Sequence, residues 1–217
     1  MKYIYKIVAN EPYTLREFRS TPNATYKGFG DIDKLLKSEL CNEQGFICCY
    51  CMRRVLPDSM SVEHFIPQTR HSDSPYSDTF HRENQLKYSN MLASCNDSLR
   101  NCSGIRGNIP LTLDPMNKLI ENQVGCLKNG KMTTSSKNIA VENDIEKALQ
   151  LNNQTLKDNR ARIIKKVRDD CDQANWQPKR LRSHLKSWQS KDSNGYFKEY
   201  CQVAVAFLSK QLSKSRK

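Results

Sequence analysis

The sequence lacks a long apolar run. Its longest strongly apolar segment extends from Val203 to Leu208, whereas a membrane-spanning helix needs about 20 consecutive apolar residues. The N-terminal residues MKYIYKIVANEPYTL also lack the apolar core of a secretion signal. Glycine and proline are scarce, at 8 residues each, which excludes collagen-like and low-complexity chains. The 217 residues, 37% of them hydrophobic, therefore predict a cytoplasmic globular protein with one domain, or one domain with a helical appendage.

Acidic residues are scarce in the last third of the chain. The segment from Thr155 to Lys217 carries 16 Lys and Arg residues against 6 Asp and Glu, and the formal charge of the whole chain is +12. Such a segment is typical of a protein that binds a polyanion, because displacing counterions from phosphates drives association. Charge alone does not separate DNA, RNA and an acidic protein surface, and a solvated helical face is a simpler alternative. The residues expected to face nucleic acid are Arg160, Arg162, Lys165, Lys166, Arg180 and Arg182.

The nine cysteines are an odd number, which argues against a closed disulfide framework. Cys48 and Cys51 form a C-x-x-C pair, and Cys95 and Cys102 form a second pair with a longer gap. Two short-spaced pairs of thiolates suit tetrahedral zinc. The sequence therefore predicts one structural zinc bound by these four residues. The other five are interpreted as buried or idle thiols, namely Cys41, Cys49, Cys126, Cys171 and Cys201.

Apolar periodicity and turn signals divide the chain into three parts. Residues 1–44 are expected to contain a short strand over 1–9 and a helix that begins at Asp31 and stops at Gly45. Residues 45–115 have short apolar segments broken by prolines, and we expect small strands, loops and one helix. Residues 116–217 are expected to form a hairpin with its turn at Asn129-Gly130, followed by basic helices from about Glu142. The predicted fold class is α+β.

Glu63 and His64 lie between the two cysteine pairs. They follow the alternating stretch 60–62, and neighbouring side chains on an ideal strand point to opposite faces. Both can serve one site only where the strand ends and twists. A histidine flanked by an acid and bracketed by two zinc half-sites is a candidate for acid–base chemistry. The remaining histidines are interpreted as surface residues, namely His71, His81 and His184.

At these positions the sequence resembles the HNH nuclease family, whose fold is also called ββα-metal. The resemblance covers about residues 45–110. The order and spacing of these motifs resemble those of PtuB, the HNH subunit of Septu anti-phage systems. PtuB accompanies the ABC-type ATPase PtuA and also occurs as a retron effector. The resemblance implies a small zinc-stabilised ββα-metal core flanked by an N-terminal helix and a C-terminal helical region. It rests on Cys48-x-x-Cys51, Glu63-His64-Phe-Ile-Pro67, Asn90-Met-Leu-Ala-Ser-Cys95 and Cys102-Ser-Gly-Ile-Arg106-Gly107, with weaker likeness at Pro12-x-x-Leu15 and from Leu149 to Arg160.

The resemblance implies a role for each matching residue. His64 takes the place of the general base that deprotonates an attacking water. Glu63 takes the place of an acidic ligand of a catalytic Mg²⁺ or Mn²⁺. Asn90 matches an asparagine that orients the histidine through backbone hydrogen bonds.

The third metal ligand departs from the family pattern. Families with C-N-x-x-K carry a metal-binding asparagine directly after the last cysteine, where this chain has Ser103. Asn101 is taken as the replacement, with Asn96 and Asn108 as weaker alternatives. Arg106 occupies the basic position and is expected to contact nucleic acid.

These features predict a metal-dependent HNH endonuclease that hydrolyses phosphodiester bonds in DNA or in structured RNA such as tRNA. The resemblance implies the toxic effector nuclease of a Septu-like or retron-linked anti-phage system, gated by a PtuA-like ATPase. A retron reverse transcriptase with its RNA–DNA hybrid is a further expected partner. The sequence has no P-loop, so any ATP dependence must reside in a partner. Two alternatives remain: a non-catalytic zinc-ribbon module that binds nucleic acid, and a scaffold subunit whose basic helices bind a partner.

Overall fold

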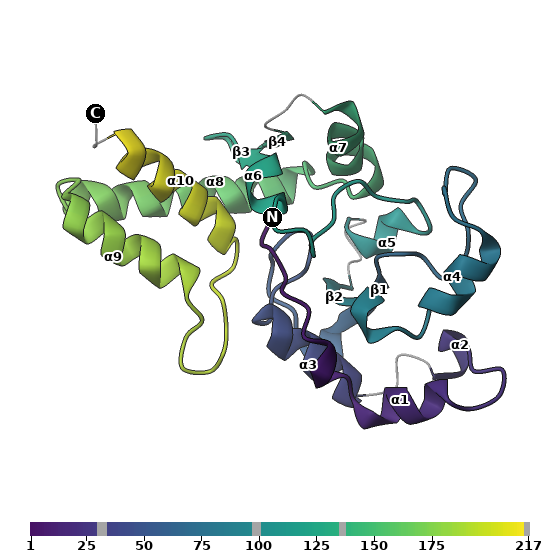
Figure 1. Ribbon diagram of the computed structural model, residues 1–217. Coiled ribbons are helices and arrows are strands. Elements are labelled where there is room, and N and C mark those ends of the chain that lie inside the picture. Colours follow the sequence, from purple (N-terminus) through teal and green to yellow (C-terminus); the bar gives the residue numbers. More distant parts are fainter. Residues whose placement is uncertain (30–33, 97–100, 135–137, 215–217) are drawn as a thin grey trace.

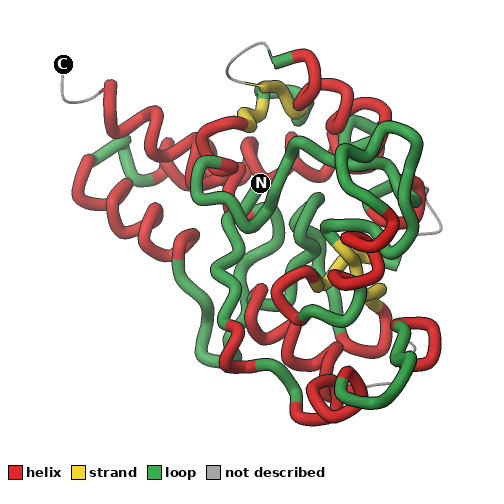
Figure 2. The backbone as a smooth tube through the Cα atoms, turned by 45° about the vertical axis from the view of Figure 1, so that its right-hand side comes forward, coloured by secondary structure: helices red, strands yellow, loops and turns green. Residues whose placement is uncertain are grey.

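The computed structural model describes residues 1–29, 34–96, 101–134 and 138–214. These residues form mainly helices, together with two antiparallel two-stranded sheets (Figures 1 and 2). The predicted α+β class is confirmed. The strands are β1 (Met60–His64), β2 (Met91–Cys95), β3 (Val124–Cys126) and β4 (Met132–Thr134), and the helices are α1 (Tyr13–Arg19), α2 (Tyr26–Phe29), α3 (Lys34–Gln44), α4 (Asp78–Asn84), α5 (Ser103–Arg106), α6 (Ile120–Gln123), α7 (Ile139–Asn143), α8 (Gln154–Gln173), α9 (Pro178–Gln189) and α10 (Cys201–Lys214). Shorter helical turns cover η1 (Val8–Asn10), η2 (Pro57–Ser59), η3 (Tyr88–Asn90) and η4 (Asp144–Ala148).

The sheet of β1 and β2 lies at the centre of the cysteine-rich part. Its register places Glu63 opposite Leu92 and His64 opposite Met91. Every residue of β2 is buried, because α3 and α5 both contact it. A strand covered on both sides is stabilised by apolar and small residues throughout, which is what the sequence MLASC provides. Along the chain α4 and η3 lie between β1 and β2, and α5 follows β2, so the assignment of these elements to a ββα-metal core stays a prediction.

The N-terminal residues do not form the predicted strand. Residues 1–7 are extended and the turn η1 follows them. Ile4 N donates to Pro115 O at 2.8 Å, but a proline has no N–H to return the bond, so no ladder develops there. Met1 and Ile4 are buried, whereas Tyr5 and Ile7 of the apolar alternation that suggested a strand are exposed.

The helix predicted from Asp31 is present as α3, although Asp31 itself lies outside the described residues. It ends before Gly45, which has a φ of 63°. Leu36 and Leu40 are buried on its inner face, whereas Leu35 is exposed. The predicted stop at Gly45 is confirmed.

The predicted hairpin joins β3 to β4. Leu127 N donates to Lys131 O at 2.8 Å, and Gly130 has a φ of 81°. The helices α8, α9 and α10 follow, with α10 packed against the other two. These three helices lie together at the opposite end of the molecule from β1, β2 and α4 in both ribbon views (Figures 1 and 2).

Arg160 is an interior residue and not a surface residue as expected. Its Nε donates to Gly130 O at 2.7 Å and its Nη2 donates to Leu151 O at 2.6 Å, so it ties α8 to the hairpin. Burial lowers the pKa of its guanidinium. Arg160 lies four residues from both Leu156 and Ile164 on the buried stripe of α8, and this spacing was the available sign that it faces inward.

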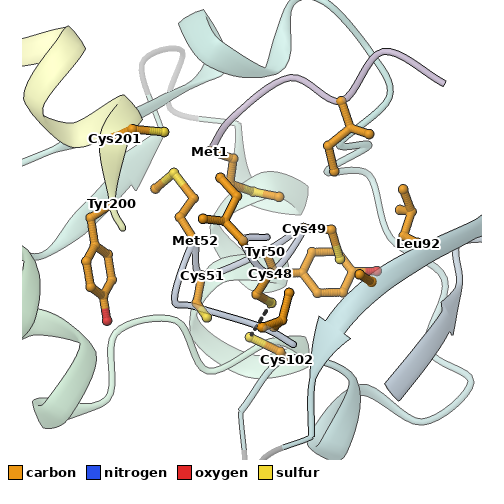
Figure 3. Packing of buried hydrophobic residues seen from close by; sticks show 14 of the residues in the cluster. Met1, Cys48, Cys49, Tyr50, Cys51, Met52, Leu92, Cys102, Tyr200 and Cys201 are labelled. Carbon is orange, nitrogen blue, oxygen red and sulfur yellow. Dashed lines mark hydrogen bonds between the residues drawn. The ribbon is translucent and has the colours of Figure 1, made fainter. Parts of the chain in front are cut away.

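The buried hydrophobic residues form one cluster that draws on all three predicted parts of the chain. Figure 3 shows the segment from Cys48 to Met52 at its centre, with Met1 and Cys201 near it. The division at residues 44 and 115 stays a prediction about organisation. Within the described residues, no helix combines the length and the apolar character that crossing a membrane requires.

We expect Gly130→Ala to destabilise the protein more than Gly195→Ala. A Cβ at Gly130 would lie 1.9 Å from Lys157 O, whereas a Cβ at Gly195 meets nothing within 4 Å. Both glycines have positive φ, so the control substitution should cost about 1–2 kcal/mol through strain alone. Gly130→Ala should cost roughly 3 kcal/mol or more, because α8 must also move. Equal melting temperatures for the two variants would contradict this account.

Candidate metal centre and active site

The four predicted zinc ligands come together in the structure. The Sγ atoms of Cys48, Cys51, Cys95 and Cys102 all lie within 4.8 Å of one another, and all four residues are buried. The Cys48–Cys102 sulfur pair, joined by a dashed line in Figure 3, is 3.9 Å apart, and the Cys51–Cys95 pair is 3.8 Å apart. A zinc–sulfur bond of about 2.3 Å gives a tetrahedral edge of about 3.8 Å. The cluster is therefore compatible with the predicted structural zinc.

Local backbone geometry presents these thiols. Cys48 N donates to Arg53 O at 2.8 Å and Met52 N to Cys48 O at 3.1 Å, which makes a tight turn that carries the first pair. Cys49 N donates to Ala93 O at 3.0 Å and ties this turn to β2. Cys95 ends β2, and Cys102 precedes α5, so the cluster joins the turn, the sheet and the helix.

The polar residues around the four cysteines can stabilise the negative charge of a zinc–thiolate cluster. Four thiolates with one zinc ion carry a net charge of −2, and Nη2 of Arg53 lies 3.5 Å from Cys95 Sγ. The amide Nδ2 of Asn101 lies 3.5 Å from Cys102 Sγ, and its Oδ1 accepts from Arg53. The structure thus places Asn101 at the thiol cluster. Its predicted role as a ligand of a catalytic ion gains no support, because its carboxamide contacts Cys102 and Arg53.

The other five cysteines are separate thiols in the structure. Cys126 is half-buried and the rest are buried. Burial raises the pKa of Cys41 to about 12 and that of Cys201 to about 11, which keeps both protonated at neutral pH. These values agree with the interpretation of these two residues as unreactive packing residues.

His64 is the last residue of β1, where the strand gives way to a loop. Its Nε2 lies 2.9 Å from Gln85 O, and a carbonyl can only accept, so Nε2 carries the proton in the neutral ring. Nδ1 therefore holds the lone pair, 3.3 Å from Nε2 of Gln68. The edge of Tyr26 packs against the ring at 4.4 Å between centroids, and 6% of His64 is exposed.

Asn90 holds the loop that follows His64. Its Oδ1 accepts from Ile66 N at 2.7 Å, and its Nδ2 donates to Ile66 O at 2.9 Å and to Asn84 O at 3.0 Å. Its own backbone oxygen accepts from Phe65 N at 3.0 Å. These bonds fix the strand end from β2, which is consistent with the orienting role that the resemblance implies.

Arg106 is buried and cannot lie on a nucleic-acid-binding surface as expected. Its Nη1 bonds Glu63 Oε1 and donates to His64 O at 3.0 Å, and its Nη2 donates to Phe65 O at 2.6 Å. Tyr50 OH donates to the same carboxylate oxygen at 2.7 Å. Arg106 therefore ties α5 to the end of β1. The basic residue at this position was visible in the sequence, but its inward direction was not.

The Glu63 carboxylate offers one oxygen to a metal ion. Burial raises its pKa, whereas Arg106 and the Tyr50 hydroxyl favour the ionised form. Oε1 is engaged by these two residues, and Oε2 makes no hydrogen bond with the described part of the chain. Glu63 retains 8% side-chain exposure. Of the predicted pair of catalytic metal ligands, Glu63 is thus available through one atom and Asn101 is elsewhere; the alternatives Asn96 and Asn108 are exposed.

A cleft of about 350 Å³ adjoins the loop that follows His64 and is lined partly by residues 65–67. His81 contributes to its wall and is buried, not exposed as expected: its ring nitrogens lie 2.6 Å from Pro67 O and 2.9 Å from Ser74 Oγ. His81 thus braces the loop. His71 and His184 are only partly buried.

The remaining predicted nucleic-acid contacts are on the surface of the C-terminal helices. Arg162, Lys165 and Lys166 are exposed on α8. Lys165 and Lys166 each pair with an aspartate four residues later. Arg180 and Arg182 are exposed on α9.

Comparison with known proteins supports a nuclease. No protein-family model matches the chain. Over 103 residues the chain is 31% identical to an Escherichia coli protein named "Retron Ec83 putative HNH endonuclease". The match covers 44% of this chain and 37% of that relative, so the chain spans well under half of the relative's length. This partial similarity supports a relationship to HNH endonucleases over the matched residues.

We expect one zinc ion per chain, and Cys51→Ser should release it. Structural zinc contributes directly to folding, so the melting temperature should fall with the metal content. Elemental analysis of the purified protein measures the zinc. Cys126→Ser is the matched control, because Cys126 lies outside the cluster, and it should keep one zinc ion. Well-folded wild-type protein without zinc would contradict the assignment.

Proposed function

We propose that the protein is an HNH endonuclease that uses His64 as the general base for phosphodiester hydrolysis. The observation that carries this proposal is the hydrogen bond from Nε2 to Gln85 O, which leaves the lone pair on Nδ1. An imidazole in this tautomer can accept a proton from water near neutral pH. The attacking oxygen forms a bond to phosphorus, its proton passes to Nδ1, and the leaving sugar oxygen departs and takes up a proton from solvent.

The neighbouring residues keep this histidine in position. Arg106 binds the backbone oxygens of His64 and Phe65, and Asn90 binds both backbone groups of Ile66. A base fixed in this way loses little freedom on reaching the transition state. The zinc cluster anchors the other end of α5, so Arg106 is itself held from two sides.

We propose that Mg²⁺ or Mn²⁺ is the catalytic ion and that Glu63 Oε2 is its protein ligand. Magnesium commonly keeps several waters and takes one or two carboxylates together with substrate phosphates, so a single carboxylate oxygen suits it. When bound, such an ion stabilises negative charge on the phosphate and the leaving oxygen. Arg106 and Tyr50 would hold the carboxylate in place from the opposite side.

The substrate and the biological setting are part of the same proposal. The exposed cations of α8 and α9 support a nucleic-acid substrate, either DNA or structured RNA such as tRNA. The name of the E. coli relative supports a role beside a retron, and with it an effector nuclease in a retron-linked or Septu-like anti-phage system. A PtuA-like ATPase and a retron reverse transcriptase with its RNA–DNA hybrid are the proposed partners, in the cytoplasm.

The cover over His64 supports gating by such a partner. Tyr26 of α2 packs on the imidazole, and Tyr26 N also donates to Gln85 Oε1 at 3.1 Å. With 6% of His64 exposed, we propose that a phosphate reaches Nδ1 only after this cover shifts. We propose that partner or substrate binding moves α2.

The same contacts favour a second candidate, a non-catalytic zinc-containing subunit that binds nucleic acid or a partner. Both ring nitrogens of His64 have hydrogen-bond partners, and one oxygen of Glu63 is bound to Arg106. In that case the two residues would only stabilise the core. Cleavage assays separate the two candidates.

We expect His64→Gln to lower the cleavage rate by about 10²–10⁴-fold. The glutamine amide can still donate to Gln85 O, but it cannot accept a proton near neutral pH. Purified protein, with and without its ATPase partner, is incubated with total cellular DNA and RNA in magnesium or in EDTA. His71→Ala, at a partly exposed site, should retain full activity. Full activity of His64→Gln would rule out this active site, and activity in EDTA would rule out the metal.

We expect Tyr26→Ala to raise partner-independent cleavage several-fold, because it uncovers a base that Gln85 still orients. Phe29→Ala is the matched control: Phe29 packs on Tyr26 of the same helix and on Phe18 of α1, but its ring does not stack on His64. Initial rates without the partner measure the effect, and zinc content confirms folding. A rate below that of the wild type would show that Tyr26 positions the histidine and does not cover it.

A further inference from the structure

A basic cavity lies at the end of the molecule formed by the C-terminal helices. It measures about 390 Å³ and is bounded by α8, α10, the turn after α8 and the turn of the β3–β4 hairpin. Its lining contains four cations, two aromatic rings and no acidic residue. The cations are Lys128, Lys165, Arg168 and Lys214, and the rings belong to Trp176 and Phe207.

The carboxylates near this cavity do not neutralise it. Asp169 pairs with Lys165 at 2.7 Å, but the two side chains are 48% and 77% exposed, and exposed pairs of this kind exchange readily with other ions. Asp172 accepts from Trp176 Nε1 at 2.8 Å and so serves to orient the indole. Four cations therefore line the cavity, and within the described part of the chain only Lys165 of these forms an exposed ion pair, with Asp169.

Trp176 is held beside the cavity by an unusual backbone. Asn175 and Trp176 have φ values of 48° and 51°. A left-handed residue after a helix is common for asparagine, but it is rare for a bulky side chain such as tryptophan. Trp176 N donates to Cys171 O at 2.9 Å, and this bond with the indole bond to Asp172 fixes the ring at the cavity.

We propose that this cavity binds single-stranded nucleic acid, with a base stacked on Trp176 and adjacent phosphates on Lys165, Arg168 and Lys128. Cations that follow the backbone beside an aromatic platform are the features that bind single strands, because every unpaired base offers a face for stacking. A duplex keeps its bases stacked on one another, so it cannot use the indole in this way. The inference rests on the proposed function only in taking nucleic acid as the ligand.

The position of the cavity makes it a holding site separate from the cleavage site. The helices that line it lie across the molecule from β1 and α4 in both ribbon views (Figures 1 and 2). A strand bound here would be anchored at one end of the protein while another part reaches His64. This arrangement would select substrates that carry an unpaired segment.

The adjacent lysine on α8 provides a matched control. Lys165 and Lys166 are both exposed and both pair with an aspartate at i+4. Lys165 lines the basic cavity, whereas Lys166 lines a different cavity that also contains Asp170 and Glu199. The charge removed is therefore the same in Lys165→Gln and Lys166→Gln, but only the first belongs to the proposed site.

Tryptophan fluorescence tests the proposal directly, because the chain has two tryptophans. Trp188 is buried on α9 and lies under Lys198, so Trp188→Phe preserves an aromatic ring there and leaves Trp176 as the reporter. The full-length zinc-loaded protein, which also carries His64→Gln to prevent cleavage, is titrated with a thymidine oligonucleotide and with an abasic oligonucleotide of equal length. A duplex of the same length is titrated in parallel.

We expect the thymidine strand to quench Trp176 saturably and the abasic strand and the duplex to quench it far less. Lys165→Gln combined with Arg168→Gln should weaken binding at least tenfold and lower the salt dependence by about 0.7 for each lost phosphate contact. Lys166→Gln should weaken binding far less than Lys165→Gln alone, because Lys166 lies outside the cavity. Equal quenching by the thymidine and abasic strands would overturn base stacking, and equal weakening by Lys166→Gln would overturn the site.

Cleavage by the wild-type protein separates this inference from the proposed nuclease. Absence of quenching in a protein that cleaves nucleic acid would overturn the strand-binding cavity and leave the nuclease in place. Saturable quenching in a protein that never cleaves would support the cavity and overturn the nuclease.

Discussion

The convergence of four thiols on one point is the constraint on which the rest of this structure depends. The turn at Cys48–Cys51, the end of β2 and the start of α5 contribute little regular hydrogen bonding to one another, and the β1–β2 sheet is five residues deep. A small sheet of this kind is marginal on its own. A tetrahedral zinc site would add four strong bonds within the hydrophobic cluster, and it would fix the direction in which α5 leaves the sheet. That direction decides where Arg106 points.

Arg106 links the region of the four cysteines to Glu63 and His64, the residues of the proposed active site. Its guanidinium reaches across from α5 to Glu63 and to the backbone oxygens of His64 and Phe65. Such a buried ion pair costs desolvation, so its value lies more in fixing a geometry than in adding stability. Here the geometry is the end of β1, where Arg106 bonds the Glu63 carboxylate and the backbone oxygens of His64 and Phe65 together.

The C-terminal helices have a different physical character. Arg160 is buried, and its hydrogen bonds connect α8 to the hairpin. The basic residues Arg162, Lys165 and Lys166 of the same helix are exposed. Net charge therefore overstates the basic surface of α8 by one residue. The exposed cations also divide between two cavities on either side of α8, one free of acidic lining residues and one of mixed charge. The helix therefore does not present the single basic face that a count of charges suggests.

Patterns between neighbouring residues predict much of this organisation. The C-x-x-C spacing, the turn at Asn129-Gly130, the stop at Gly45 and the 3.6-residue periodicity after Glu142 all concern neighbours within a few positions, and such patterns act before any tertiary contact exists. The sequence alone therefore determined the members of the four-cysteine cluster, the hairpin and the helical C-terminal part. It could also single out His64 and Glu63, because they stand between the cysteine pairs. Only the tertiary structure decided the directions of long polar side chains. Arg106, Arg160, Asn101 and His81 can reach several ångströms toward solvent or toward the core, and the partners that turn them inward come from residues distant in the chain or from backbone oxygens that no residue type reveals.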